Sequence, residues 1–378
     1  MIINNTMSEP TIKNLKIALV HDWIIGGGAE KVIYELHQMF PDAPIYTSYC
    51  SDEWRKKLDD KVVTGWLQHF PRLRKFMVIP RIWWFEKLNL SSFDVVISTS
   101  GNGEAFSVKT SPNTLHINYC HTPTHYYWRH YKQYLANPGF GIFNPVVRFF
   151  LRLLTSPLRK WDFRAAQRAD VMVANSTHIQ KDIKKYYKRD SVVIHPPVET
   201  NRFKQTKYPK KDYYLSLGRQ VPQKFVHIIV EACNELGLPL VVAGNGPENT
   251  NLMNIAGPTI TFDNSKFSDE KVVEYMASAK AFIFPSLEDF GITPVEAMSA
   301  GTPVLAYRNG GAIDYVIPGK TGDFFTEQTT ESLVASLRSF DPDSYKQSDL
   351  EKVSSEFSTQ IFRKKILELL NTKTNLHV

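Results

Sequence analysis

The sequence has little cysteine and no long apolar run. Its 378 residues include three cysteines, which lie far apart at Cys50, Cys120 and Cys233 without a C-x-x-C pair. We therefore expect neither a disulfide framework nor a zinc site, and a reducing, cytoplasmic environment. No window of about 18 apolar residues occurs, so we expect no transmembrane helix. The polar start, MIINNTMSEPTIKN, lacks the apolar segment of a signal peptide.

Acidic residues are missing from one long stretch of the chain. None occurs between Glu104 and Asp162, whereas cations are frequent there: Lys109, Arg129, Lys132, Arg148, Arg152, Arg159 and Lys160. The net charge is +7, and the 43% hydrophobic and 22% charged residues are typical of a folded globular protein. A basic field confined to one half predicts an anionic partner there, which is a phospholipid, a nucleic acid or a phosphorylated substrate.

Short apolar runs alternate with helical patterns. The first run, Leu15 to Val20, leads into a Gly26-Gly27-Gly28 turn and then a helical pattern. Later runs are Val95–Ser98, Val171–Ala174, Val192–His195, Tyr213–Leu217, Pro239–Ala243, Ala281–Phe284 and Thr302–Ala306. Such alternation predicts parallel α/β sheets. Because His195-Pro-Pro interrupts it, we expect two Rossmann-like domains, at residues 1–200 and 201–356, with ligand-binding turns and a cleft between them.

Two carboxylates flank a predicted helix start in the second domain. Glu288 follows the strand ending near Pro285, and Glu296 lies in Thr293-Pro-Val-Glu296, which has the form of a capping box. Glu296 either caps its own helix or accepts hydrogen bonds from ligand hydroxyls. The exposed backbone N–H groups of the helix start suit an anion.

A pair of cations and a glycine turn follow other strand ends. Arg219 and Lys224 come after the strand that ends at Leu217, and they either grip a diphosphate or remain solvated at the surface. Gly26-Gly27-Gly28 does not complete G-x-G-x-x-G, which weakens a nicotinamide-cofactor interpretation. It is either a ligand-approach loop or a plain turn. His121, at another strand end, has a structural or a functional role.

In order and spacing, these motifs resemble the retaining glycosyltransferases of family four, over almost the whole chain. Glu288 and Glu296 match the family's E-x7-E motif, and Arg219 and Lys224 match its diphosphate-binding pair. Other matching segments are Gly244-Asn-Gly-Pro-Glu248, Gly310-Gly311, Asn175-Ser176 and the segment from His195 to Phe203. In style the chain is similar to bacterial O-antigen mannosyltransferases, through His21-Asp22-Trp23, Cys120-His121-Thr122-Pro123 and Glu288-Asp-Phe-Gly-Ile292.

The resemblance implies the GT-B fold, with two facing Rossmann-like domains, and a role for each matching residue. The first domain would bind the acceptor and the second the nucleotide sugar, and a C-terminal helix at about 357–378 would pack back on the first. The expected catalytic residues are His121, Glu288, Arg219 and Lys224. The expected donor-binding residues are Gly27, Gly28, Arg219, Lys224, Gly246, Phe290, Gly291, Ile292, Thr293 and Glu296.

Charge alone accounts for the expected chemistry without a metal. Breaking a sugar–phosphate bond leaves negative charge on the nucleoside diphosphate, which the two cations and the helix dipole would stabilise. Asp341-Pro-Asp343 and Asp59-Asp60 follow no strand run, so we interpret both as surface loops and expect no metal or other cofactor. Two departures from the family pattern are Phe225, where glycine usually follows the lysine, and Asp289, where glycine is common.

Two basic, aromatic stretches lie in the first domain. Phe70–Phe85 and Phe140–Trp161 mix cations with bulky apolar residues. Such stretches either lie in an anionic bilayer interface or pack their aromatic faces into the core while the cations stay solvated. We expect the first. A nucleic-acid partner is not expected, because no known binding module accompanies the charge.

Together these features predict a retaining hexosyltransferase. The expected reaction moves mannose from GDP-mannose to a lipid-linked glycan or glycolipid at the cytoplasmic membrane face, with the protein bound peripherally. Within the same fold, a UDP- or ADP-sugar donor or a nucleotide-sugar epimerase is the alternative. From another class, the alternative is a non-catalytic, membrane-associated sugar-binding scaffold.

Overall fold

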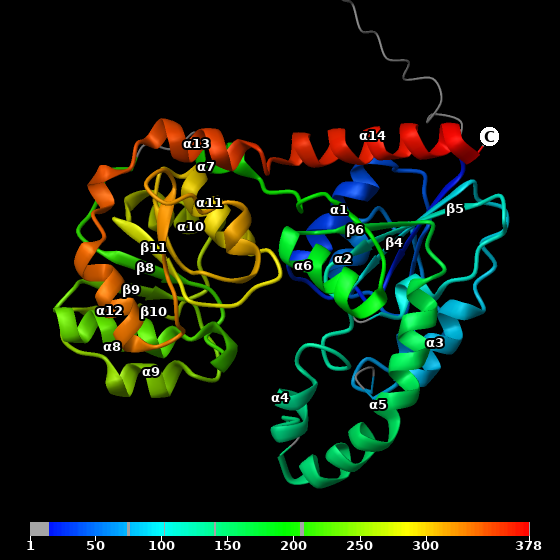
Figure 1. Cartoon of the computed structure of the whole chain (residues 1–378), viewed down its shortest axis with the longest axis horizontal. Coiled ribbons are helices and arrows are strands. Elements are labelled where there is room, and N and C mark those ends of the chain that lie inside the picture. Colours follow the sequence, from blue (N-terminus) through cyan, green and yellow to red (C-terminus); the bar gives the residue numbers. More distant parts are fainter. Residues whose placement is uncertain (1–14, 74–75, 102, 140, 205–207, 378) are drawn as a thin grey trace, which may run out of the picture. The chain divides into compact units, whose positions relative to one another are not determined.

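A computed structural model describes residues 15–73, 76–101, 103–139, 141–204 and 208–377. The chain forms two compact units (Figure 1). Unit 1 contains the residues up to Ile194 together with Arg363–Val378, and unit 2 contains His195–Phe362. The change of unit at Ile194 lies six residues before the boundary expected after residue 200, because the chain leaves the first sheet as soon as strand β7 ends.

Unit 1 is built on a seven-stranded parallel sheet in the order β3-β2-β1-β4-β5-β6-β7. Its strands are β1 (Ile17–His21), β2 (Ile45–Thr47), β3 (Val62–Val63), β4 (Val95–Ser100), β5 (Leu115–Cys120), β6 (Val171–Ala174) and β7 (Val192–Val193). Every residue of β1, β4, β5 and β6 is buried, as expected for a parallel sheet covered on both faces. The chain order reverses between β1 and β4, which is where such sheets place ligand sites.

Most of the helices of unit 1 lie against this sheet, and two of them extend away from it. They are α1 (Gly28–Met39), α2 (Asp52–Lys57), α3 (Val78–Glu86), α4 (Tyr131–Ala136), α5 (Asn144–Ala166), α6 (Thr177–Asp182) and the greater part of α14 (Thr359–His377). Arg363 of α14 donates two hydrogen bonds to Glu35 of α1, at 2.8 and 2.7 Å. By contrast, α4 and the first half of α5 extend away from the sheet (Figure 1).

Unit 2 repeats the architecture on a six-stranded parallel sheet in the order β10-β9-β8-β11-β12-β13. Its strands are β8 (Tyr214–Leu217), β9 (Leu240–Ala243), β10 (Ile260–Asp263), β11 (Ala281–Phe284), β12 (Val304–Tyr307) and β13 (Gly322–Phe325). Its helices are α7 (Thr200–Lys204), α8 (Val226–Leu236), α9 (Asn249–Ile255), α10 (Asp269–Ser278), α11 (Ile292–Ser299), α12 (Thr330–Ser339) and α13 (Gln347–Ser355). Here the chain order reverses between β8 and β11.

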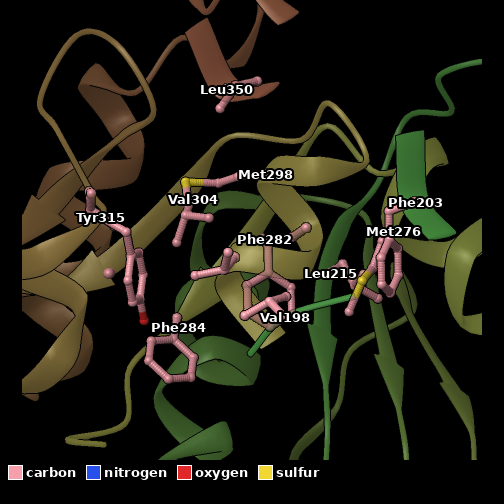
Figure 2. Packing of buried hydrophobic residues seen from close by; sticks show 14 of the residues in the cluster. Val198, Phe203, Leu215, Met276, Phe282, Phe284, Met298, Val304, Tyr315 and Leu350 are labelled. Atoms are coloured by element: carbon pink, nitrogen blue, oxygen red, sulfur yellow. The ribbon is translucent and has the colours of Figure 1, made fainter. Parts of the chain in front are cut away.

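The core of unit 2 holds the strands and α11 together. Phe282 of β11, Leu215 of β8 and Val304 of β12 pack with Met298 of α11 and with Tyr315 (Figure 2). Because α11 buries six of its eight residues, from Pro294 to Ser299, its start is placed rigidly at the end of β11. The core therefore determines where the E-x7-E segment lies.

The structure differs from the predicted elements mainly at short strands. The run Val192–His195 forms a strand only at Val192–Val193. Strands β2, β3, β10 and β13 were not predicted, because none has more than two adjacent apolar residues, which is too little hydrophobic pattern to be detected.

Candidate active site

A pocket lies at the strand-order reversal of unit 2. It is lined by residues from the ends of β8 and β11 and from the segments that follow them, among them Arg219, Lys224, Ser286 and Thr293. The open edge of a parallel sheet at such a reversal is the usual ligand position in α/β folds. The structure thus brings both predicted cations and the predicted helix start to one place.

The turn after β8 presents the two cations differently. Lys224 ends a short 3-10 helix, Pro222–Lys224, and its Nζ forms an ion pair with Glu288. Arg219 is exposed, and within the described part of the chain no acidic side chain pairs with its guanidinium. Phe225 then adopts the left-handed conformation, with φ 53° and ψ 31°, which glycine reaches without strain. The substitution at this family position therefore leaves a turn of glycine-like shape.

The turn Gly244–Glu248 braces the Arg219 turn. A Cβ on Gly244 would lie 2.0 Å from the carbonyl oxygen of Gly218, and one on Gly246 would lie 2.2 Å from that of Gln220. Gln220 is buried and donates from Nε2 to the Gly244 carbonyl at 2.9 Å. Gly246, which we expected to contact the donor, thus has a packing role in this structure. Gln220 was not predicted, since a single glutamine in a turn has no distinctive sequence signal.

The predicted capping box at Thr293 and Glu296 is wrong. Helix α11 begins at Ile292, and its N-cap is Gly291, with φ 89°, which makes no side-chain cap. Pro294 is therefore the third helical residue rather than the first. Because Gly291 has no side chain to accept the first helical N–H groups, these groups stay available to a ligand anion.

Glycines and one tyrosine hold the loop before α11. A Cβ on Gly291 would lie 2.7 Å from the hydroxyl of Tyr315, which donates to the carbonyl of Phe290 at 3.0 Å. Gly311 donates its N–H to the Glu288 carbonyl at 2.9 Å, and a Cβ there would meet the Phe290 backbone at 2.3 Å. Gly310-Gly311 thus permits close backbone packing. The Phe290 side chain is buried in the core, so only its backbone can reach a donor.

The two glutamates occupy different environments. Glu288 is about one third exposed, at 33%, beside Lys224, whereas Glu296 is buried on α11. An ionised carboxylate accepts hydrogen bonds but repels phosphate. Glu288 precedes the start of α11 in the chain and Glu296 follows it, so hydroxyl acceptors flank a helix start that attracts anions. A nucleotide sugar has both kinds of group, hydroxyls and phosphates.

A second cluster lies at the strand-order reversal of unit 1. His21 ends β1, Asp22 follows it, and His121 follows β5. Asp22 accepts hydrogen bonds from the backbone N–H groups of Gly101, at 2.8 Å, and Ala105, at 2.7 Å. The rings of His21 and His121 pack edge to face, with centroids 6.4 Å apart.

The His121 side chain is the candidate ligand contact in this cluster. It is 9% exposed, and its Nε2 atom has no hydrogen-bond partner among the described residues. Burial, with a smaller contribution from His21, lowers the pKa of His121 to about 3. The imidazole is therefore neutral near pH 7 and has an unsatisfied nitrogen, which suits a sugar hydroxyl.

The glycine turn before α1 already holds a carboxylate. Glu30 Oε1 accepts hydrogen bonds from the backbone N–H groups of Ile25, at 3.2 Å, and Gly26, at 3.0 Å. Gly27 is the N-cap residue and Gly28 begins α1, and both are exposed. Because Glu30 supplies negative charge here, the turn suits hydroxyl groups better than phosphate.

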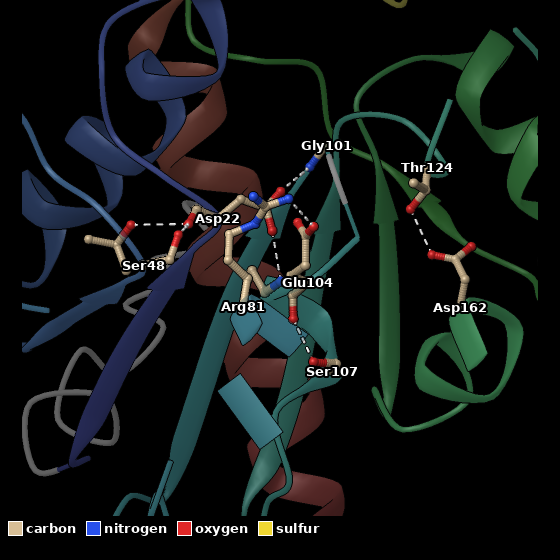
Figure 3. Close-up of polar contacts among 10 residues, drawn as sticks. Asp22, Ser48, Arg81, Gly101, Glu104, Ser107, Thr124 and Asp162 are labelled. Carbon is tan, nitrogen blue, oxygen red and sulfur yellow. Dashed lines mark hydrogen bonds and ion pairs between the residues drawn. The ribbon is translucent and has the colours of Figure 1, made fainter. Parts of the chain in front are cut away.

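Sequence reasoning missed the buried ionic groups that lie near the cluster of unit 1. Arg81 of α3 and Glu104 form an ion pair of 2.7 Å, with both side chains at most 2% exposed (Figure 3). Asp162 of α5 is fully buried and accepts hydrogen bonds from Thr124 at 2.7 Å and Trp128 at 2.6 Å. These partners lie far apart in sequence, so no local motif marks them.

One of the remaining acidic motifs lies in an exposed turn. Asp341-Pro-Asp343 spans a short 3-10 turn, where the Asp341 side chain accepts the Asp343 N–H at 3.1 Å. Among the residues that the structure describes, no group of three or more His, Cys, Asp and Glu side chains could hold a metal ion. No described helix is long and apolar enough to cross a membrane.

Comparison with known proteins identifies the family of both units. Residues 26–202 match the profile of "Glycosyltransferase Family 4", and residues 197–355 match that of "Glycosyl transferases group 1". The alpha-1,3/1,6-mannosyltransferase ALG2 of Dictyostelium discoideum is 24% identical, over 82% of this chain and 86% of that protein. A GDP-mannose-dependent alpha-(1-6)-phosphatidylinositol monomannoside mannosyltransferase of Mycolicibacterium smegmatis is 31% identical, over 28% of this chain and 32% of that protein.

Solved structures share the architecture. The crystal structure of Anabaena HepE in complex with UDP has a TM-score of 0.69 at 17% identity, covering 95% of this chain and 100% of that one. Sucrose-phosphate synthase from Thermosynechococcus elongatus has a TM-score of 0.67 at 14% identity, covering 95% and 99%. With both units matched and two parallel-sheet α/β units present, the chain belongs to glycosyltransferase family four, has the GT-B fold and is a glycosyltransferase.

Proposed function

We propose that this glycosyltransferase moves mannose from GDP-mannose, with retention of anomeric configuration, to a lipid-linked glycan or glycolipid at the cytoplasmic face of a membrane. The observation that carries the donor assignment is the meeting of Arg219, Lys224 and the uncapped start of α11 in one pocket. The mannosyl group is supported by mannosyltransferase relatives, one of which is GDP-mannose-dependent.

In this proposal, the cations and the helix start stabilise the leaving group. The bond from the sugar's anomeric carbon to the diphosphate breaks, and negative charge builds on the departing GDP. Arg219 has no ion-pair partner within the described residues, so its charge is available to the diphosphate. Lys224 lies against Glu288, and the diphosphate would compete for it. Two cations and a helix dipole supply the charge stabilisation, so we propose that no metal is needed.

The carboxylates and His121 would hold hydroxyl groups. Glu288 would accept hydrogen bonds from the donor sugar and Glu296 from the ribose, while neutral His121 would contact the sugar near the reacting carbon. With retention, the acceptor oxygen bonds to the face that the diphosphate leaves, and the acceptor proton passes to a phosphate oxygen of the leaving GDP. No carboxylate base is then required.

Calorimetric binding of GDP, UDP and ADP tests the donor assignment. We expect the protein to bind GDP more tightly than UDP or ADP. The Arg219→Ala substitution should lower the affinity for GDP about tenfold, because a charged hydrogen bond to phosphate is lost. Lys204→Ala, which removes a half-buried cation from α7, is the control and should bind GDP like the wild type. Preference for UDP or ADP would refute the mannose donor but keep the fold. Failure of all three to bind would favour a non-catalytic scaffold.

Release of GDP from GDP-mannose then tests the reaction itself. We expect turnover only when a glycolipid acceptor is supplied, and loss of turnover in Glu288→Gln, with GDP binding retained. Interconversion of the donor sugar without an acceptor would instead indicate an epimerase.

A further inference from the structure

The first half of α5 exposes large apolar side chains. No described residue between Gly141 and Leu154 is buried, whereas burial begins at Thr155. The exposed apolar side chains here are Ile142 at 88%, Phe143 at 63%, Val146 at 55%, Phe149 at 61%, Phe150 at 50% and Leu153 at 58%. We call these six residues the apolar stripe. A soluble monomer rarely leaves such a set of neighbouring large apolar residues uncovered.

Four residues of the apolar stripe lie on one side of α5, and two arginines lie on another. Val146, Phe149, Phe150 and Leu153 follow the i, i+3, i+4, i+7 spacing of a single helix face. Arg148 and Arg152 are spaced i, i+4 on a different face, and Lys160 is exposed further along. Among the described residues, none of these three cations forms an ion pair with an acidic side chain.

Hydrogen bonds join α4 and α5 into a helical hairpin. Arg148 donates from Nε to the Leu135 carbonyl at 3.1 Å and from Nη2 to the Ala136 carbonyl at 2.6 Å. These are carbonyls at the C-terminal end of α4, which have no acceptor role within the helix. Arg148 thus joins the two helices, so the stripe is presented on a preformed element that extends away from the sheet (Figure 1).

We propose that the apolar stripe docks unit 1 onto an anionic lipid bilayer, with the stripe in the interface and the cations among the headgroups. This inference rests on the proposed lipid-linked acceptor and names the surface that meets the membrane. Charge favours lipid over a second copy of the chain, because residues 105–161 contain cations but no acidic residue, and a symmetric contact would bring like charges together. A nucleic acid would not require a continuous apolar face.

The opposite end of α5 grips the loop that follows His121. Asp162 accepts a hydrogen bond from Thr124 (Figure 3) and another from Trp128. Arg159 Nε donates to the Tyr127 carbonyl at 2.5 Å. One continuous helix therefore links the apolar stripe to the segment beside His121. Lipid docking would hold that segment beside the membrane from which the acceptor comes.

Vesicle binding by the full chain tests the surface. The probes are vesicles of phosphatidylcholine alone and of phosphatidylcholine mixed equally with phosphatidylglycerol, with no donor or acceptor present. We expect the wild type to bind the mixed vesicles, and Phe149→Asp with Phe150→Asp to abolish binding. Arg152→Gln should weaken it about fivefold. Met253→Asp, at a residue of unit 2 that is 50% exposed, should bind like the wild type.

Controls separate this proposal from the proposed function. The two aspartate substitutions should leave GDP affinity and the near-ultraviolet circular dichroism unchanged, which excludes misfolding. Vesicle binding in a protein that prefers UDP would sustain the surface while refuting the donor. Equal vesicle binding by the double aspartate variant and the wild type would overturn the surface. The surface would also be overturned if the wild type binds no vesicles and forms a dimer, and if the double aspartate variant is a monomer.

Discussion

Replacing Phe225 by glycine and, separately, by alanine tests whether the Lys224 turn stores backbone strain. Phe225 has φ 53° and ψ 31°, a conformation that costs a residue with a side chain about 1–2 kcal/mol. Its ring is partly buried against the core cluster around α8, so both substitutions lose similar packing, on the order of 1–2 kcal/mol. Glycine relieves the strain but costs about 0.5–1 kcal/mol of chain entropy. We therefore expect Phe225→Gly to be more stable than Phe225→Ala by roughly 0.5–1 kcal/mol.

Urea unfolding of the two variants, followed by a probe in unit 2, measures the difference. The comparison uses midpoints at equal slopes, because the chain has two units and a single transition is not assured. GDP titration of the same proteins reports the position of Lys224. Phe225→Gly should keep wild-type affinity, since it keeps the turn, whereas Phe225→Val should lose about tenfold, because a β-branched residue resists a positive φ. The strain argument is refuted if the alanine variant equals or exceeds the glycine variant in stability.

Three further outcomes are expected. Lys224→Ala should weaken GDP binding about tenfold. It should shift the free energy of unfolding by less than about 1 kcal/mol, because the ion pair of Lys224 with Glu288 is partly exposed. A large loss of stability with unchanged GDP affinity would contradict this prediction. Gly291→Ala should destabilise the protein by about 2–4 kcal/mol, because the added Cβ would clash with Tyr315. Gly319 also has a positive φ but open space around it, so Gly319→Ala should destabilise the protein by only about 1 kcal/mol. Equal urea midpoints of the two variants would rule out the clash with Tyr315. Burial lowers the pKa of His116 from 6.5 to about 4, so the unfolded chain binds more protons in that range, and stability should fall as the pH drops from 6.5 towards 4, by up to about 1.4 kcal/mol per unit. Urea midpoints that do not change between about pH 7 and about pH 5, or that change equally in His116→Gln, would show that this burial does not matter.

Local patterns were enough to predict the architecture. Each central strand is an apolar run ended by a turn, and both features lie within a few residues of one another, so β6 and β11 were predicted with their observed bounds. The functional motifs are also local: Arg219 with Lys224, and Glu288 with Glu296, lie within one strand–turn–helix unit each. Family membership followed from their order along the chain.

Local patterns failed where two conformations fit the same residues. Thr293-Pro-Val-Glu296 has the form of a capping box, yet the core places Gly291 at the N-cap and moves the helix start. For Gly246 the motif gave no sign of a packing role, which exists because the carbonyl of Gln220 lies where a Cβ would be; its contact with a donor stays a prediction. In both cases the deciding contact comes from another segment, which a motif does not include.

The sequence by itself determined that two parallel α/β units form, that two cations follow the first strand of the second unit, and that one stretch is basic and apolar. Only the tertiary structure decided whether the apolar face of α5 is covered. A helix that packs into a core and one that meets lipid have the same hydrophobic period, so Phe149 and Phe150 are identical in both interpretations. The difference is that no described residue of unit 1 covers them and both stay at least half exposed, whereas Asp162, three to four turns later, is fully buried.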